Sequence, residues 1–189
     1  GDLGWLMAGF DIVAQCEIDE YCQKVLALRF PESVKYKDIK ELTGEKIKKE
    51  VGAVDIVAGG FPCTDISTAR NNAEGLDGEY SGLWFEQLRL IRALRPKYAV
   101  VENVSALLVR GFGEVLGGLA EIGYDAEWQM FSSAMFGGHH RRLRLYIVAY
   151  PSSGRLQGIF QKCGESIKAN AKSSSKVASL YFNESLQDD

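Results

Sequence analysis

The spacing of hydrophobic residues changes several times along the chain and divides it into strand-like and helix-like segments. Asp11–Cys16 is a short, mostly apolar run typical of a buried strand. Apolar residues then recur at helical spacing from Glu20 to Phe30, where Pro31 ends the pattern. Val34–Tyr36 predicts a further short strand, and a polar helix is expected over Thr43–Glu50.

The alternation continues through the middle of the chain. Val54–Ala58 predicts the next strand, and an amphipathic helix is expected over Leu83–Leu94. The later expected elements are a strand over Tyr98–Glu102, a helix over Gly113–Ile122, and strands over Glu127–Ser132 and Leu143–Tyr150. Strands that alternate with helices predict an α/β domain with a mainly parallel sheet.

The composition changes at Pro151. The stretches S-S-G-R and N-A-K-S-S-S-K that follow are polar and weakly patterned. Such segments rarely bury enough apolar surface to form a core of their own. We therefore expect residues 1–150 to form the main domain and residues 151–189 to form a peripheral polar extension, a linker or the start of a variable region.

Composition limits the classes of function. The chain has 189 residues and a net charge of -3, which is unlike a simple basic nucleic-acid clamp but allows a local basic patch. No apolar run approaches the ~18 residues that a membrane span needs. The four cysteines form no C-x-x-C pair, so we expect reduced thiols in a cytosolic compartment and no zinc cluster.

Several chemically active side chains follow predicted strands. Glu17 comes directly after the first strand, Asp38 follows the second, and Cys63 and Glu102 follow two later ones. In open α/β sheets, ligands bind beyond the carboxyl ends of the strands. The sequence therefore predicts that three acids and a thiol converge on one edge of the sheet.

Each of these residues has two interpretations. Glu17 could accept hydrogen bonds from a ribose, or it could be an acid in an ordinary surface turn. Pro62 would hold the Cys63 thiol on a stiff turn, but a buried structural cysteine is the alternative. Glu102, in V-V-E-N-V, follows the four apolar residues Tyr98–Val101, where desolvation would favour its protonated form. A turn or helix-capping acid would explain it equally well.

The stretch H-H-R-R-L-R is the one concentrated basic feature. Arg142 and Arg144 alternate and so point to the same side of a strand, as a binding patch or a solvated edge strand would require. His139 and His140 have no third ligand suggested nearby. We expect no metal site.

Four motifs in this order resemble the DNA cytosine-5 methyltransferases: G-G-F-P-C-T-D-I-S, S-G-L-W-F-E, V-V-E-N-V, and R-R-L-R before an apolar strand. The resemblance covers residues 1–150 and implies a Rossmann-like, S-adenosylmethionine-dependent methyltransferase fold with a partial catalytic domain. The family's N-terminal strand and glycine-rich loop have no counterpart here. Because that strand is central, beside the strand that leads to Cys63, we expect a gap or a non-native pairing.

The resemblance implies catalytic roles. Cys63 would attack C6 of a cytosine, and Glu102 would hold and protonate N3. Arg144 would contact the base carbonyl, and Arg142 would brace the site. Thr64 and His140 depart from the family pattern, which has glutamine at both places. The loop at residues 64–80 would close over the base.

The resemblance also implies a site for S-adenosylmethionine. Glu17 would bind the ribose, Ile18 the adenine ring and Asp38 the adenine amino group. Phe61 and Pro62 would line the methionine end. The predicted cofactor-binding set is completed by Ile39 and Leu83.

The implied activity is methyl transfer from S-adenosylmethionine to C5 of a cytosine flipped out of double-stranded DNA. A catalytically inactive relative that binds cofactor or DNA is the first alternative. An unrelated thiol hydrolase is the second, but it leaves Glu-Asn-Val unexplained. The resemblance predicts that the protein is located in the cytoplasm of a prokaryote or of a phage-infected cell. It allows a cognate restriction endonuclease as a partner. It also predicts weak or no activity for this chain alone.

Overall fold

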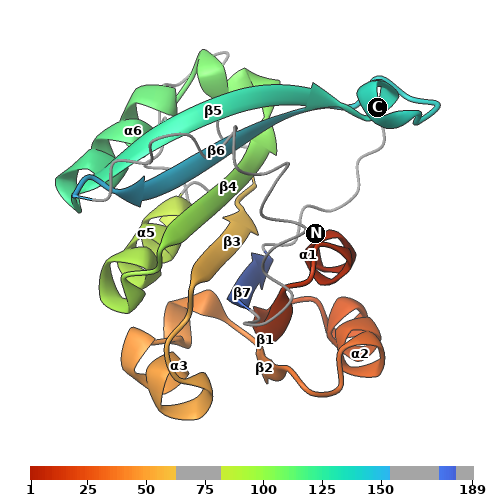
Figure 1. Cartoon of the computed structure of the whole chain (residues 1–189), viewed down its shortest axis with the longest axis vertical. Coiled ribbons are helices and arrows are strands. Elements are labelled where there is room, and N and C mark those ends of the chain that lie inside the picture. The colour runs from red at the N-terminus through yellow and green to blue at the C-terminus, as the bar shows by residue number, and fades with distance from the viewer. Residues whose placement is uncertain (63–81, 154–174, 182–189) are drawn as a thin grey trace.

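The computed structural model describes residues 1–62, 82–153 and 175–181. Its strands are β1 (Asp11–Cys16), β2 (Val34–Tyr36), β3 (Ile56–Gly60), β4 (Tyr98–Val104), β5 (Tyr124–Ser132), β6 (Leu143–Pro151) and β7 (Lys176–Tyr181). They form one seven-stranded sheet in the order β2-β1-β7-β3-β4-β6-β5 (Figure 1). β6 is antiparallel to both of its neighbours, and the other pairs are parallel. The prediction of an α/β domain with a mainly parallel sheet is confirmed.

Helices cover both faces of this sheet. They are α1 (Asp2–Met7), α2 (Glu20–Arg29), α3 (Gly44–Val51), α5 (Gly82–Leu94) and α6 (Phe112–Glu121). In Figure 1, α3, α5 and α6 lie on one side of the sheet, and α1 and α2 lie on the other. The larger core cluster includes Ile47, Leu90 and Leu119 from the first group, whereas Trp5 of α1 packs on a smaller one. None of the helices in the described ranges has the length and apolar composition needed to cross a bilayer.

Local signals explain the helix boundaries that the sequence predicts. Asp19 precedes α2, and its carboxylate accepts a 2.8 Å hydrogen bond from the Cys22 N–H. Thr43 caps α3 through a 3.2 Å bond from the Lys46 N–H. Gly52 ends α3 with φ at 79°, a conformation that favours glycine. These caps satisfy backbone groups that a helix end leaves without partners.

β7 is the largest departure from the sequence-based expectations. It lies between β1 and β3, and the side chains of Val177, Ala178, Ser179 and Leu180 are at most 2% exposed. The prediction that residues 151–189 are peripheral is therefore wrong for Lys176–Tyr181. Of the two outcomes expected for the centre of the sheet, a gap is not observed, and pairing with another segment is, since β7 lies there. A six-residue strand in a polar stretch gives too short a pattern to separate it from a loop.

The amino end of β7 is fastened mainly by Asp55. The Asp55 N–H donates to the Lys176 carbonyl at 3.0 Å, and its Oδ2 accepts from the Lys176 N–H at 2.9 Å. Its other carboxylate oxygen pairs with Lys97 Nζ at 2.7 Å. On the β1 side, the Asp11 N–H donates to the Ser175 carbonyl at 3.0 Å. One carboxylate therefore joins the starts of β3, β4 and β7.

We expect Asp55→Asn to lower the thermal midpoint at pH 7 and to weaken its pH dependence. Burial acts to raise the pKa of Asp55, but hydrogen bonds from Lys97 and Lys176 and the charges of both lysines lower it overall. A lowered folded-state pKa contributes stability above the unfolded value of about 3.9, and this is lost as pH falls towards the folded value. Thermal unfolding followed by circular dichroism between about pH 7 and 2.5 measures both effects.

Asp125→Asn is the matched control, because Asp125 is an exposed β5 carboxylate far from β7 in the strand order. If Asp55→Asn keeps the wild-type pH profile, the carboxylate does not secure β7.

Candidate active site

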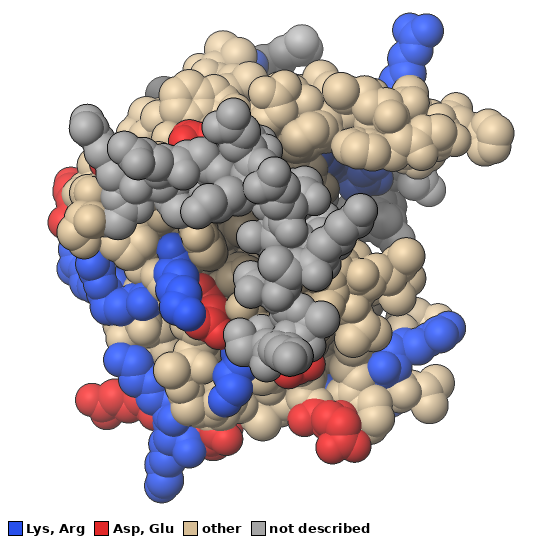
Figure 2. Space-filling view, in the orientation of Figure 1, with Lys and Arg blue, Asp and Glu red and all other residues tan. Residues whose placement is uncertain are grey.

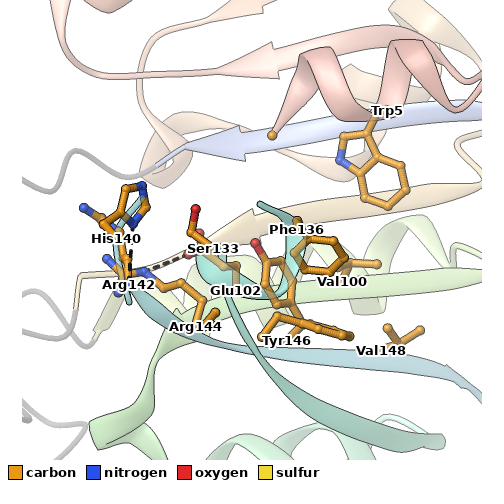
Figure 3. Close-up of a pocket in the computed structure, with 13 residues that line it drawn as sticks. Trp5, Val100, Glu102, Ser133, Phe136, His140, Arg142, Arg144, Tyr146 and Val148 are labelled. Carbon is orange, nitrogen blue, oxygen red and sulfur yellow. Dashed lines mark hydrogen bonds and ion pairs between the residues drawn. The ribbon is translucent and has the colours of Figure 1, made fainter. Parts of the chain in front are cut away.

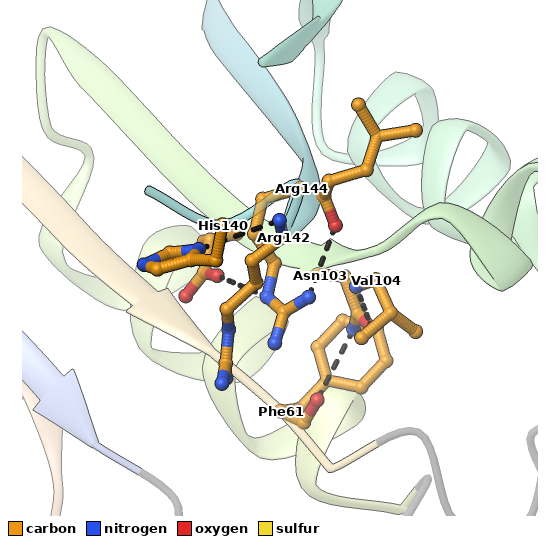
Figure 4. Close-up of polar contacts among 8 residues, drawn as sticks. Phe61, Asn103, Val104, His140, Arg142 and Arg144 are labelled. Carbon is orange, nitrogen blue, oxygen red and sulfur yellow. Dashed lines mark hydrogen bonds and ion pairs between the residues drawn. The ribbon is translucent and has the colours of Figure 1, made fainter. Parts of the chain in front are cut away.

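The carboxyl ends of β3 and β4 lie side by side. Gly60 is opposite Glu102 in the parallel register. A Cβ on Gly60 would lie 2.7 Å from the Glu102 carbonyl oxygen, so this close approach requires glycine. The buried Asn103 side chain donates to the Phe61 carbonyl at 3.1 Å, as Figure 4 shows. The chain that leaves β3 at Pro62 is thereby held against the end of β4.

The predicted nucleophile, Cys63, lies outside the described residues, as do Thr64 and the predicted closing loop at residues 64–80. The first described range ends at Pro62, two residues beyond the Gly60–Glu102 pair. Cys63 facing Glu102 stays a prediction.

Glu102 and Arg144 form an ion pair across β4 and β6. Arg144 Nε lies 3.1 Å from Glu102 Oε1, and the side chains are 18% and 44% exposed respectively. The expected desolvation of Glu102 is therefore not observed. Its side chain reaches an open pocket at the strand end, on the face opposite the core that buries Val101 and Asn103.

An open pocket of about 640 Å³ adjoins this ion pair (Figure 3). At one end lie Glu102, Arg144, Arg142 and His140. The other end is apolar and aromatic, with contributions from Trp5, Val100, Phe136, Tyr146 and Val148. A pocket with one charged and one aromatic end suits a flat ring that carries polar groups on its edge.

The basic stretch contributes to the pocket from one strand end. Arg142 and Arg144 both line it, as their alternation predicts. The Arg142 N–H donates to His140 Nδ1 at 3.4 Å. The Arg142 carbonyl accepts from the Ser133 N–H at 3.3 Å. The part of the chain that the structure describes contains no group of three or more potential metal ligands.

A second set of predicted site residues gathers at the end of β1. Glu17 is only 7% exposed, and its Oε1 accepts a 2.8 Å bond from the Asp19 N–H. Burial raises the pKa of Glu17; the N–H bonds from Asp19 and Ile18 oppose this rise, while the Asp19 charge adds to it. Ile18 is 49% exposed, so its side chain offers apolar surface next to this carboxylate.

Asp38 lies near the same strand end. Its carboxylate caps the short 3-10 helix Ile39–Glu41 through a 2.8 Å bond from the Lys40 N–H. Burial, together with the charges of Asp38 and Glu17, raises the pKa of the Cys16 thiol to about 12. Glu17 directly follows Cys16, and Asp38 lies two residues after Tyr36, which pairs with Cys16 in the parallel register. Both acids therefore lie near the end of β1, as the strand pattern predicts.

The other predicted cofactor residues are more enclosed. Ile39 is 3% exposed and packs in the main core. Phe61 is buried against Trp84, with ring centroids 5.6 Å apart, and Pro62 is also buried. Leu83 packs at the edge of the same core. In the described structure, these side chains pack into the core below the carboxyl edge of the sheet.

Sequence reasoning missed the aromatic half of the pocket. Tyr146 lies opposite Glu102 in the antiparallel register of β4 and β6. Burial raises the pKa of Tyr146; the Glu102 charge adds to the rise and the Arg144 charge opposes it. A period-two pattern from Arg144 would have placed Tyr146 on the same face. No such signal pointed to Trp5 or Phe136, which arrive from other elements.

The arrangement of strands and helices defines a Rossmann-like methyltransferase fold. The DNMT2 methyltransferase of Spodoptera frugiperda is similar in structure, with a TM-score of 0.66 and 19% identity, over 94% of this chain and 50% of that one. The family model described as C-5 cytosine-specific DNA methylase matches residues 1–188. The chain belongs to this family, which confirms the resemblance that the motifs indicate.

Curated relatives agree with this assignment. The type II methyltransferase M.Sau3AI of Staphylococcus aureus is 36% identical over 123 residues, which cover 60% of this chain and 29% of that protein. Type II methyltransferase M2.BsuMI of Bacillus subtilis is 33% identical over 156 residues, or 78% of this chain and 38% of that protein. The chain thus spans about a third of the length of these relatives.

Proposed function

We propose that this chain carries the cofactor- and base-binding part of a DNA cytosine-5 methyltransferase. The supporting observation is the Glu102–Arg144 ion pair at the charged end of the pocket. It lies beside the strand end that leads through Pro62 to Cys63. A carboxyl group and a guanidinium held together can bind the polar edge of a pyrimidine ring.

The proposed chemistry assigns each side chain a separate task. The Cys63 thiolate forms a bond to C6, and the electron density that this adds to the ring is taken up at N3. Glu102 donates a proton or a strong hydrogen bond there. Arg144 holds Glu102 in place and contacts the base carbonyl, while Arg142 braces the pocket edge. After C5 has taken the methyl group from the bound donor, loss of the C5 proton restores the ring, expels the thiolate and returns the N3 proton to Glu102.

The proposed substrate is double-stranded DNA with the target cytosine flipped out. A stacked base cannot reach a pocket built on a sheet edge, and flipping costs a few kcal/mol. Figure 2 shows Lys and Arg interspersed with Asp and Glu around the lower part of the molecule in this view. Local cations at the pocket, Arg142 and Arg144, are the groups best placed to meet a polar base and its phosphates.

The end of β1 fits S-adenosylmethionine, which supplies a methyl group on a positively charged sulfur when bound. The buried Glu17 carboxylate can accept hydrogen bonds from ribose hydroxyls. The exposed Ile18 can pack on an adenine ring, and the Asp38 carboxylate can accept from its amino group. These residue types match the group that the family uses.

Isothermal titration with S-adenosylhomocysteine tests this proposal. We expect the wild-type chain to bind and Glu17→Gln to bind about 10-fold or more weakly, since hydrogen bonds to charged groups contribute about 1.5–3 kcal/mol. Because the pKa of Glu17 is raised, wild-type affinity should fall as pH decreases through a value above the ordinary ~4.3. Glu17→Gln should lack this pH dependence.

The sign of the stability effect separates binding from unfolding. For an acid whose folded-state pKa is raised, protonation favours the fold, so weaker binding at lower pH would not arise from unfolding through Glu17. Glu20→Gln, at an exposed position at the start of α2, is the matched control and should bind like wild type. Equal affinity for wild type and Glu17→Gln would exclude the ribose role.

A further inference from the structure

β7 lies at the point where the strand order of the sheet reverses. From β7, the strands β1 and β2 follow on one side, and β3 and β4 follow on the other. In open α/β sheets, the ligand crevice forms at this reversal, outside the carboxyl ends of the strands. Leu180 is opposite Cys16 on β1, and Tyr181 is opposite Gly60 on β3. The end of β7 therefore lies between the end of β1, which leads to Glu17, and the end of β3, which leads to Phe61.

Next to β7, α1 runs from the carboxyl ends of the strands back towards their amino ends. Its start is at the carboxyl edge, since Gly1 lines the pocket with Glu102 and the Gln15 side chain donates to Asp2. Its end leads to Asp11, which bonds to the Ser175 carbonyl at the opposite edge. β1 then runs parallel to β7. In space, β7, α1 and β1 have the arrangement of a β-α-β unit, although β7 is the last strand in the sequence.

Gly59 on β3 allows β7 to pack closely against β3. A Cβ at this position would lie 2.4 Å from the Leu180 carbonyl oxygen and 3.0 Å from the Leu180 Cβ. The backbone oxygen cannot move aside as a flexible side chain can. Glycine at position 59 therefore allows the carboxyl end of β7 to fit against β3, directly before Phe61 and Pro62.

We propose that β7, from the C-terminal part of the chain, is the first strand of the cofactor-binding β-α-β unit and that Leu180–Tyr181 forms the base of the S-adenosylmethionine crevice. The cofactor part of this inference rests on the proposed function. The strand Lys176–Tyr181, which the sequence pattern assigns to a polar extension, would then complete the catalytic domain.

A circular permutant of the full chain tests this arrangement. Residues 175–189 are placed before residues 1–174, so that β7 precedes α1. The new connection, residues 182–189 with Gly1, can span up to about 30 Å. We expect a thermal midpoint within a few degrees of wild type and an S-adenosylhomocysteine affinity within about 3-fold. Failure of the permutant to fold, or a loss of affinity above about 10-fold while wild type binds, would overturn the inference.

Gly59→Ala tests the contact in the native chain order. The added methyl should push Leu180 away and weaken S-adenosylhomocysteine binding about 10-fold or more, with a lower thermal midpoint. Gly117→Ala on α6 is the control, because a Cβ there meets nothing within 4 Å. Wild-type binding by Gly59→Ala would count against the inference. If neither wild type nor a normally folded permutant binds, the proposed function fails and the strand arrangement is still supported.

Discussion

Cys63→Ser is expected to abolish covalent capture of DNA that contains 5-fluorocytosine. In the proposed reaction, the thiolate leaves only after the C5 proton is removed, and fluorine at C5 cannot leave as a proton. The wild-type chain should therefore accumulate a protein–DNA adduct even when turnover is slow. Denaturing electrophoresis after incubation with S-adenosylmethionine measures the adduct, which the serine variant should lack entirely.

Two further variants sharpen this experiment. Glu102→Gln should slow adduct formation by about 10²–10⁴-fold, the usual contribution of a general acid or base. Cys22→Ser is the matched control, because Cys22 is a free thiol on α2, outside the pocket. An adduct that persists in Cys63→Ser would refute the proposed nucleophile, and one lost in Cys22→Ser would show that the assay reports general damage.

Ala178→Asp is expected to prevent cooperative folding. Ala178 is fully buried at the centre of the sheet, where it pairs with Ala14 on β1 and Val57 on β3. An unpaired carboxylate there costs several kcal/mol, a large part of the ~5–15 kcal/mol that stabilises a typical domain. Thermal unfolding followed by far- and near-ultraviolet circular dichroism measures this effect, and the variant should show no cooperative transition.

The control for this change is the same substitution at an exposed position. Ala27 lies on the solvent side of α2, so Ala27→Asp should cost less than about 1 kcal/mol, mainly through helix propensity. A cooperative transition in Ala178→Asp close to that of wild type would mean that β7 is not required for the sheet.

Many elements of the fold could be predicted from the sequence because their signals are local. The strand at Asp11–Cys16 has the predicted bounds, and the helix at Glu20–Arg29 begins at its Asp19 cap and ends before Pro31. β7 could not be predicted in this way. Its position depends on open hydrogen-bonding edges on β1 and β3, which exist only after those strands have assembled.

The candidate site shows the same division. The order of Glu17, Asp38, Cys63 and Glu102 along the chain, each after a strand, is a property of the sequence alone, and so is the family resemblance that the family model confirms.

The tertiary structure alone decided that Arg144 pairs with Glu102, that aromatic side chains from separate elements form the rest of the pocket, and that a C-terminal segment occupies the middle of the sheet. Local patterns record which face of an element is apolar and where it ends. Pairing between distant strands depends on register, backbone clearance at residues such as Gly59, and the edges that remain open, none of which a local pattern contains.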